Sequence, residues 1–201
     1  MPKVVDHDER RREIIAVVWR LVATRGIEAM SMRTIAQEAG YANGVLSYYF
    51  ANKDDVIRQA YDYVYTATNN RIAGLIGDSR GLAALRIFCG EVMPRTPEAL
   101  LEARIATTLW DRAMYDPVIN RTNVEAMQTW RDEIVGFLDD AVSDGEIAPT
   151  DTILAADSWL SSMMGMQIMA VLTPDLMPAM RQDELLESFI AGLYGPTAAS
   201  R

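Results

Sequence analysis

The stretch that decides the fold is residues 31–53, which read SMRTIAQEAGYANGVLSYYFANK. Ser31 precedes a short segment with helical periodicity, and its hydroxyl is suited to cap the first turn. Gly40 follows that segment, where a glycine in the left-handed conformation commonly ends a helix. A second short helix is expected over residues 43–50. Two short helices joined at a glycine-containing turn form a helix-turn-helix, whose second helix enters the major groove of DNA.

This stretch resembles the DNA-binding domain of the TetR family of bacterial transcriptional regulators. The resemblance covers roughly Glu9–Tyr61 and follows the order and spacing of the family signature. The residues that carry it are Gly26, Thr34, Ile35, Ala36, Gly40, Gly44, Leu46, Tyr49, Phe50 and Lys53. The resemblance implies an all-α chain, with a three-helix helix-turn-helix DNA-binding domain followed by a helical ligand-binding and dimerisation domain.

The rest of the chain shows helical periodicity with clear start signals. Thr96-Pro97 and Asp116-Pro117 each place a capping residue before a proline at the first helical position. No segment shows the sustained alternation typical of a strand, so we expect an all-α chain of about nine helices. The helix that begins at Asn52 is expected to bury Val56, Ile57, Ala60, Tyr63 and Val64.

Three regions are expected. Residues 1–52 form the DNA-binding domain, residues 53–195 form the effector-binding and dimerisation domain, and residues 196–201 form a disordered tail. Residues 1–7 are interpreted as a mobile arm. This end of the chain is made positive by Lys3, Arg10, Arg11 and Arg12, which belong either to a solvated helix start or to a contact with phosphates or the minor groove.

Charge is distributed unevenly along the 201 residues, which carry a net charge of −9. Residues 1–60 hold nine basic and eight acidic residues, whereas residues 61–201 hold ten and twenty. We therefore expect a local basic patch on an acidic body, with DNA binding that depends strongly on salt.

Composition favours a soluble cytoplasmic protein. Cys89 is the only cysteine, so no intramolecular disulfide forms. The charged start lacks the apolar core of a secretory signal, and no apolar run is long enough to cross a membrane.

Enzyme chemistry finds little support in the sequence. His7 is the only histidine, which excludes histidine-based metal clusters and a Ser-His-Asp arrangement in the ordered chain. No glycine-rich loop follows a strand. We expect no catalytic residues, no metal and no cofactor.

The resemblance implies which residues read DNA. Arg33 matches a base-contacting position and can reach a guanine, although a surface salt bridge is the alternative. Asn43 is suited either to base contact or to helix capping, and Gly44 allows close approach of the backbone to the groove. The proposed contacts are Arg33, Asn43, Gly44 and Val45 to bases, and Ser47, Tyr48, Tyr49 and Lys53 to phosphates.

Family members dimerise through their last two long helices, predicted here at about Asp151–Leu172 and Gln182–Tyr194. The first is apolar nearly all round, which favours contact on more than one side. A buried helix in a monomer is the alternative. The partners implied are a double-stranded DNA operator, read as a palindrome, and a second copy of the chain.

The resemblance also implies a small-molecule effector site within the body. The expected lining residues are Phe88, Met93, Arg104, Trp110, Met114, Met127, Trp130, Met163 and Gln167, although the methionines also suit a core. The start of the chain and the second helix of the helix-turn-helix also resemble the choline-sensing branch of the family. That implies a cation held by Trp110 or Trp130 and an acid such as Asp111.

The resulting hypothesis is a ligand-responsive repressor that leaves its operator when the effector binds. A constitutive DNA-binding protein, or an activator, without an effector is the alternative, and a body without a cavity would favour it.

Overall fold

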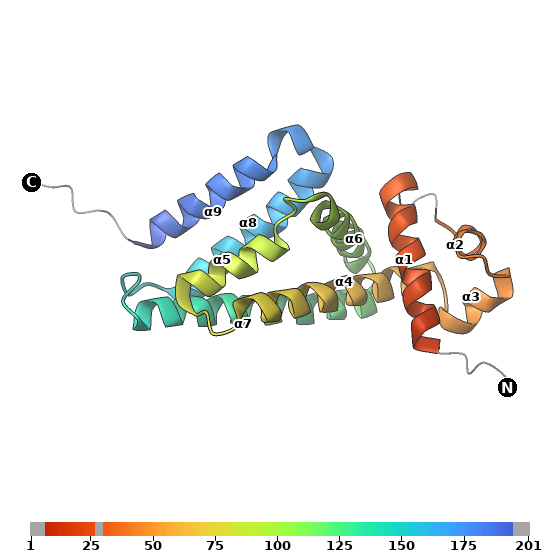
Figure 1. The fold of residues 1–201 in the computed structure, drawn as a ribbon, viewed down its shortest axis with the longest axis horizontal. Helices are drawn as coiled ribbons and strands as arrows, with labels where there is room; N and C mark the ends of the chain where they lie inside the picture. Colours follow the sequence, from red (N-terminus) through yellow and green to blue (C-terminus); the bar gives the residue numbers. More distant parts are fainter. Residues whose placement is uncertain (1–6, 27–29, 195–201) are drawn as a thin grey trace, which may run out of the picture.

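The computed structural model describes residues 7–26 and 30–194, and the regular structure in these residues is entirely helical. The predicted all-α fold is therefore confirmed. Three helices form the head at one end of the molecule, and a long fourth helix runs from the head into the body (Figure 1). The helices are α1 (His7–Arg25), α2 (Met32–Glu38), α3 (Asn43–Tyr49), α4 (Lys53–Ile76), α5 (Gly81–Val92), α6 (Pro97–Ala113), α7 (Pro117–Ser143), α8 (Thr152–Leu172), the short 3-10 helix η1 (Pro174–Leu176) and α9 (Ala179–Leu193).

Local hydrogen bonds fix the ends of the two motif helices. The Ser31 hydroxyl accepts a hydrogen bond from the Thr34 backbone N–H at 3.1 Å. The Thr34 hydroxyl accepts one from the Ser31 N–H at 3.0 Å, which completes a reciprocal cap. Gly40 has φ 74°, a conformation that L side chains rarely adopt, so the turn between α2 and α3 requires it.

The start of α4 is held by a second set of caps. Asn52 Oδ1 accepts a hydrogen bond from the Asp55 N–H at 2.8 Å, and Asp55 Oδ2 accepts one from the Ala51 N–H at 3.0 Å. Burial raises the pKa of Asp55, but hydrogen bonds from Ala51, Gln59 and Arg58 outweigh it and leave the pKa below its usual value. The carboxylate therefore stabilises the junction between α3 and α4.

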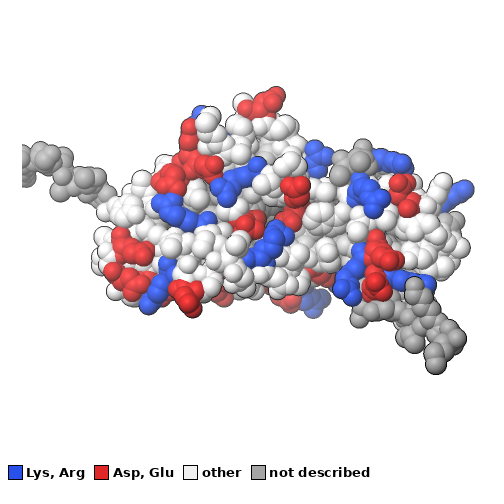
Figure 2. Space-filling model, in the orientation of Figure 1, with Lys and Arg blue, Asp and Glu red and all other residues white. Residues whose placement is uncertain are grey.

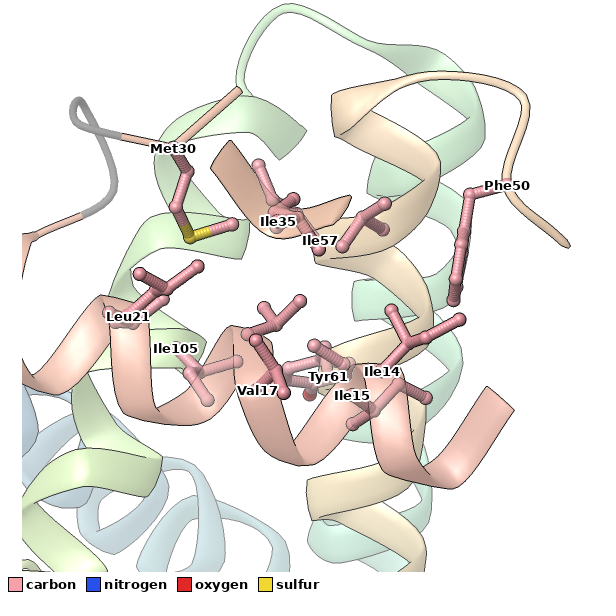
Figure 3. Close-up of a cluster of buried hydrophobic side chains, with 14 of the residues drawn as sticks. Ile14, Ile15, Val17, Leu21, Met30, Ile35, Phe50, Ile57, Tyr61 and Ile105 are labelled. Carbon is pink, nitrogen blue, oxygen red and sulfur yellow. The ribbon is translucent and has the colours of Figure 1, made fainter. Parts of the chain in front are cut away.

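The head is packed directly onto the body. Its core contains the apolar faces of α1 to α3 and the first half of α4, and it continues into α6 and α7. Figure 3 shows Ile105 of α6 among side chains of α1, near Val17 and Leu21. Ile105 is 2% exposed and Leu109 is fully buried, so α6 packs against the head and closes its core on the side of the body.

A second core lies in the body and joins α5, α7, α8 and α9. Trp159 of α8 stacks on Phe189 of α9, with ring centroids 4.6 Å apart. The Trp159 indole N–H donates to Cys89 Sγ at 2.9 Å, and burial raises the pKa of Cys89 to about 12. The thiol is therefore a protonated core group.

The start of α9 is tied to the turn between α5 and α6. The Gln182 side-chain amide is buried and donates hydrogen bonds to the Pro94 and Met177 carbonyls, both at 3.1 Å. Among the described helices, none combines the length and apolar character needed to cross a membrane.

Several predicted details are wrong. Tyr63 is 43% exposed, and Tyr61 takes the expected inner position with 4% exposure. The last helix begins at Ala179, three residues before the predicted Gln182, because Pro178 occupies its N-cap position. His7 lies in α1 and not in an arm, while residues 1–6 are outside the described residues.

Asp55→Asn is expected to lower the melting temperature near pH 7 by about 2–4 °C, the scale of about 1 kcal/mol in a chain of this size. Because the folded-state pKa is depressed, the contribution of Asp55 is present above the unfolded pKa of about 3.9 and is lost as pH falls through the folded value. The difference from wild type should therefore shrink in acid. Thermal melts followed by circular dichroism measure it, with Asp54→Asn as control. A deficit that is equal at every pH would contradict this account.

Candidate DNA-binding surface and effector cavity

The second helix of the motif, α3, has both exposed and half-buried residues on its surface. Ser47 and Gly44 are exposed, whereas Val45 is half-buried and packs against the head core. A Cβ added at Gly44 would meet no atom within 4 Å, so the fold itself does not require glycine there. Asn43 begins the helix, and its side chain is outside what the structure describes.

Arg33 is exposed in the first turn of α2, and Lys53 is half-buried at the first position of α4. Positive charge at both places adds to the backbone N–H groups of the helix starts, which favours anions. Figure 2 shows basic and acidic groups interspersed over the visible face, without one large basic area. The expected basic patch is therefore small on this face.

The two adjacent tyrosines of α3 have different environments. Tyr48 is 74% exposed, whereas Tyr49 is 6% exposed. The Tyr49 hydroxyl lies 3.1 Å from His7 Nδ1, and the Tyr48 and Tyr49 rings meet edge to face at 5.3 Å. Tyr48 is thus accessible at the surface of α3, while Tyr49 joins α3 to the start of α1.

An inner cavity lies between α4, α6 and α7, beneath the head. Its volume is about 30 Å³, enough for about two water molecules. The residues that line it are Tyr61, Val64, Tyr65, Thr68, Val92, Ala99, Glu102, Ala103, Ala106, Trp110, Met127, Trp130 and Gln167. This space is smaller than a drug-sized or choline-sized molecule.

Aromatic rings form one side of the inner cavity. The Tyr61 and Tyr65 rings stack at 6.0 Å, and Tyr65 lies 5.5 Å from the Trp130 ring. The Trp130 indole N–H donates to Asn69 Oδ1 at 2.9 Å. The buried indole N–H of Trp110, another lining residue, has no hydrogen-bond partner among the described residues.

Glu102 supplies the acidic group among the described lining residues. Its Oε2 accepts hydrogen bonds from Arg71 Nη2 at 3.0 Å and from the Thr68 hydroxyl at 3.1 Å. Arg71 Nε also donates to Glu91 Oε2 at 3.1 Å. Arg71 therefore ties α4 to both α5 and α6.

Glu102 and Arg71 also line an outer cleft of about 580 Å³. Trp19 of α1, Arg95 and Asp183 lie in the same cleft. Glu102 consequently stands between the inner cavity and the surface, next to a residue of the head.

The predicted ligand residues separate into two groups. Trp110, Met127, Trp130 and Gln167 line the inner cavity. The others lie elsewhere: Phe88, Met93 and Met163 are buried in the body core, Arg104 is half-buried outside the cavity lining, and Met114 is 69% exposed. Asp111, the acid expected beside a cation, is exposed as well.

Sequence reasoning missed Tyr61, Tyr65 and Glu102. A usable signal was present, because Tyr61, Tyr65 and Thr68 recur at helical spacing on one face of α4. On α6, the small residues Ala99, Ala103 and Ala106 leave space on the same face as Glu102.

Comparison with known proteins supports a regulatory role. The family model for bacterial regulatory proteins of the tetR family matches residues 14–60, and the model for the C-terminal domain of BetI-type transcriptional repressors matches residues 82–195. The HTH-type transcriptional regulator PksA of Bacillus subtilis is 26% identical over 175 residues, covering 87% of this chain and 84% of PksA. The regulator BetI of Burkholderia lata is 26% identical over 125 residues, covering 60% of this chain and 63% of BetI.

Solved structures share the fold. A transcriptional regulator from Saccharomonospora viridis, determined in complex with choline, has a TM-score of 0.86 at 20% identity and covers 92% of this chain and 97% of its own. A TetR transcription regulator from Haloarcula marismortui has a TM-score of 0.84 at 17% identity, with 92% and 98% coverage. Because the repressor-domain match alone spans more than half of the residues, this chain belongs to the TetR family of bacterial transcriptional regulators and carries a BetI-type C-terminal domain.

Proposed function

We propose that this regulator is a repressor that binds a palindromic operator as a dimer and leaves it when a small cation enters the inner cavity. The observation that carries the proposal is the shared wall: α4 lines the cavity and begins directly after the reading helix. The choline complex of the Saccharomonospora viridis regulator supports an effector over the alternative of a constitutive DNA-binding protein or an activator without one.

DNA contact is assigned to α3 and its neighbours. Arg33, Asn43 and Gly44 approach base edges, and Val45 adds an apolar contact beside its packing role. Ser47, Tyr48 and Lys53 contact phosphates, which position the head without reading sequence. The burial of Tyr49 favours a packing role over a phosphate contact.

The effector is proposed to be a small cation with a hydrogen-bond acceptor. Stacked tyrosines and two indoles favour positive charge, and Glu102 adds a negative charge. The unpartnered N–H of Trp110 suits a hydroxyl or carbonyl oxygen. Choline, the molecule named with the Saccharomonospora viridis structure, has this chemistry.

Release of DNA follows from the small size of the cavity. A ligand larger than about two water molecules must push α4, α6 and α7 apart. Since α4 continues from the head, such movement changes the distance between the two heads of a dimer. The effector acts because it favours one head spacing over another.

Footprinting of the DNA upstream of the protein's own gene tests this function. We expect protection of a palindrome whose half-sites lie about 34–36 Å apart or a multiple of that distance. Choline or a related small cation should remove the protection. A footprint without a palindrome would contradict the proposal, and protection that no cation relieves would support the constitutive alternative.

Gly44→Ala tests the close approach of α3 to DNA. The substitution should retain or raise the melting temperature, because alanine favours a helix by up to about 1 kcal/mol over glycine and the space is open. Operator affinity should fall by about tenfold or more, on the scale of about 1.4 kcal/mol. Gly136→Ala in α7, also in open space, is the matched control and should leave affinity unchanged. Equal affinity of the two variants would remove Gly44 from the interface.

The dimer is proposed to form through α8 and α9. Large apolar side chains remain exposed along this side of the body, namely Leu154, Ile168, Met169, Leu172, Leu176, Met180 and Leu185. Exposed apolar side chains in such number are typical of an interface, and a two-fold axis would pair this surface with itself.

Leu172→Glu should convert the dimer to a folded monomer, because two like charges would be buried at the axis-related surface. Operator affinity should then fall by about 100-fold through loss of the second head. Sedimentation and gel shift measure both effects. Leu75→Glu, at an exposed leucine of α4, is the control. A wild-type chain that sediments as a monomer at micromolar concentration would overturn the proposed dimer.

A further inference from the structure

We propose that Glu102 couples the inner cavity to the head, because a bound cation and Arg71 of α4 compete for its carboxylate. The inference rests on the proposed effector function of the cavity and identifies the contact that transmits binding. In the structure the carboxylate is held by Arg71 and Thr68, both on α4.

The position of Glu102 makes the competition direct. Its side chain is 15% exposed, and it lines the inner cavity and the outer cleft together. Arg71 approaches from the cleft side, with 42% of its side chain exposed. A cation in the cavity would approach the same carboxylate from the aromatic side.

Charge balance favours exchange over shared contact. Arg71 pairs with two carboxylates, Glu102 and Glu91, so a cation that takes Glu102 leaves each positive group with one carboxylate partner. Arg71 can turn toward water and keep its second partner, Glu91. The ion pair between α4 and α6 then opens, while the ion pair between α4 and α5 remains.

Loss of that contact reaches the head through α6 as well as α4. Ile105 lies one turn after Glu102 on α6 and is buried in the head core beneath α1. Trp19 of α1 faces the outer cleft beside Arg71. The Arg71–Glu102 ion pair therefore stabilises the arrangement of head and body seen in the structure.

Calorimetric titration of the full chain with choline and its neutral isostere 3,3-dimethylbutan-1-ol tests the competition. Glu102→Gln should weaken choline binding by about tenfold or more and change binding of the alcohol much less. Arg71→Gln should tighten choline binding by about threefold or more, because the competing cation is absent. A folding defect cannot produce a gain of affinity.

Operator binding with and without saturating choline gives a second readout. Choline should weaken wild-type operator affinity by about tenfold, within the usual range of allosteric coupling. In Arg71→Gln this ratio should approach one, since the contact that choline breaks is already missing. Glu98→Gln removes the same charge from α6 outside the inner cavity and should match wild type in choline affinity.

The outcomes separate the two proposals. If wild type binds choline and releases DNA but Glu102→Gln and Arg71→Gln both match Glu98→Gln, the coupling role of Glu102 is overturned and the effector function stands. If wild type binds neither choline nor the alcohol, the proposed cation function is overturned and the coupling role with it.

Discussion

The rest of the structure depends on one helix that belongs to two cores. The first half of α4 buries Val56, Ile57, Ala60 and Tyr61 in the head, and Ile72 near its end lies in the body core. Close-packed cores resist partial displacement. We therefore expect a change in packing at one end of α4 to displace the other end. The inner cavity lies between the two ends.

Ion pairs connect neighbouring helices at the surface of the body, outside the apolar core. Arg131 donates to both oxygens of Asp157, at 2.5 and 2.9 Å, and Arg80 pairs with Asp140 and Asp144. These exposed pairs contribute little individually. The Arg71–Glu102 pair differs because its carboxylate is only 15% exposed and lines a cavity.

Much of the fold could be predicted because its signals are local. A cap such as Ser31 or Asn52 acts within three residues, and Gly40 is required by a single backbone angle. The wrong predictions concern side chains whose burial depends on residues that are close in space but distant in sequence. Periodicity placed Tyr63 inside, yet the packing of α1 and α6 against α4 selected Tyr61.

The sequence by itself determined the helix-turn-helix, the order of the helices and the family, because caps, glycines and apolar spacing act over a few residues. Only the tertiary structure decided which side chains share the inner cavity. Glu102 meets Thr68 and Arg71 from 31 to 34 positions earlier in the chain, whereas Asp111 and Met114 are exposed outside the cavity. That choice depends on how α4, α6 and α7 rotate against one another, which is set by packing of the whole core.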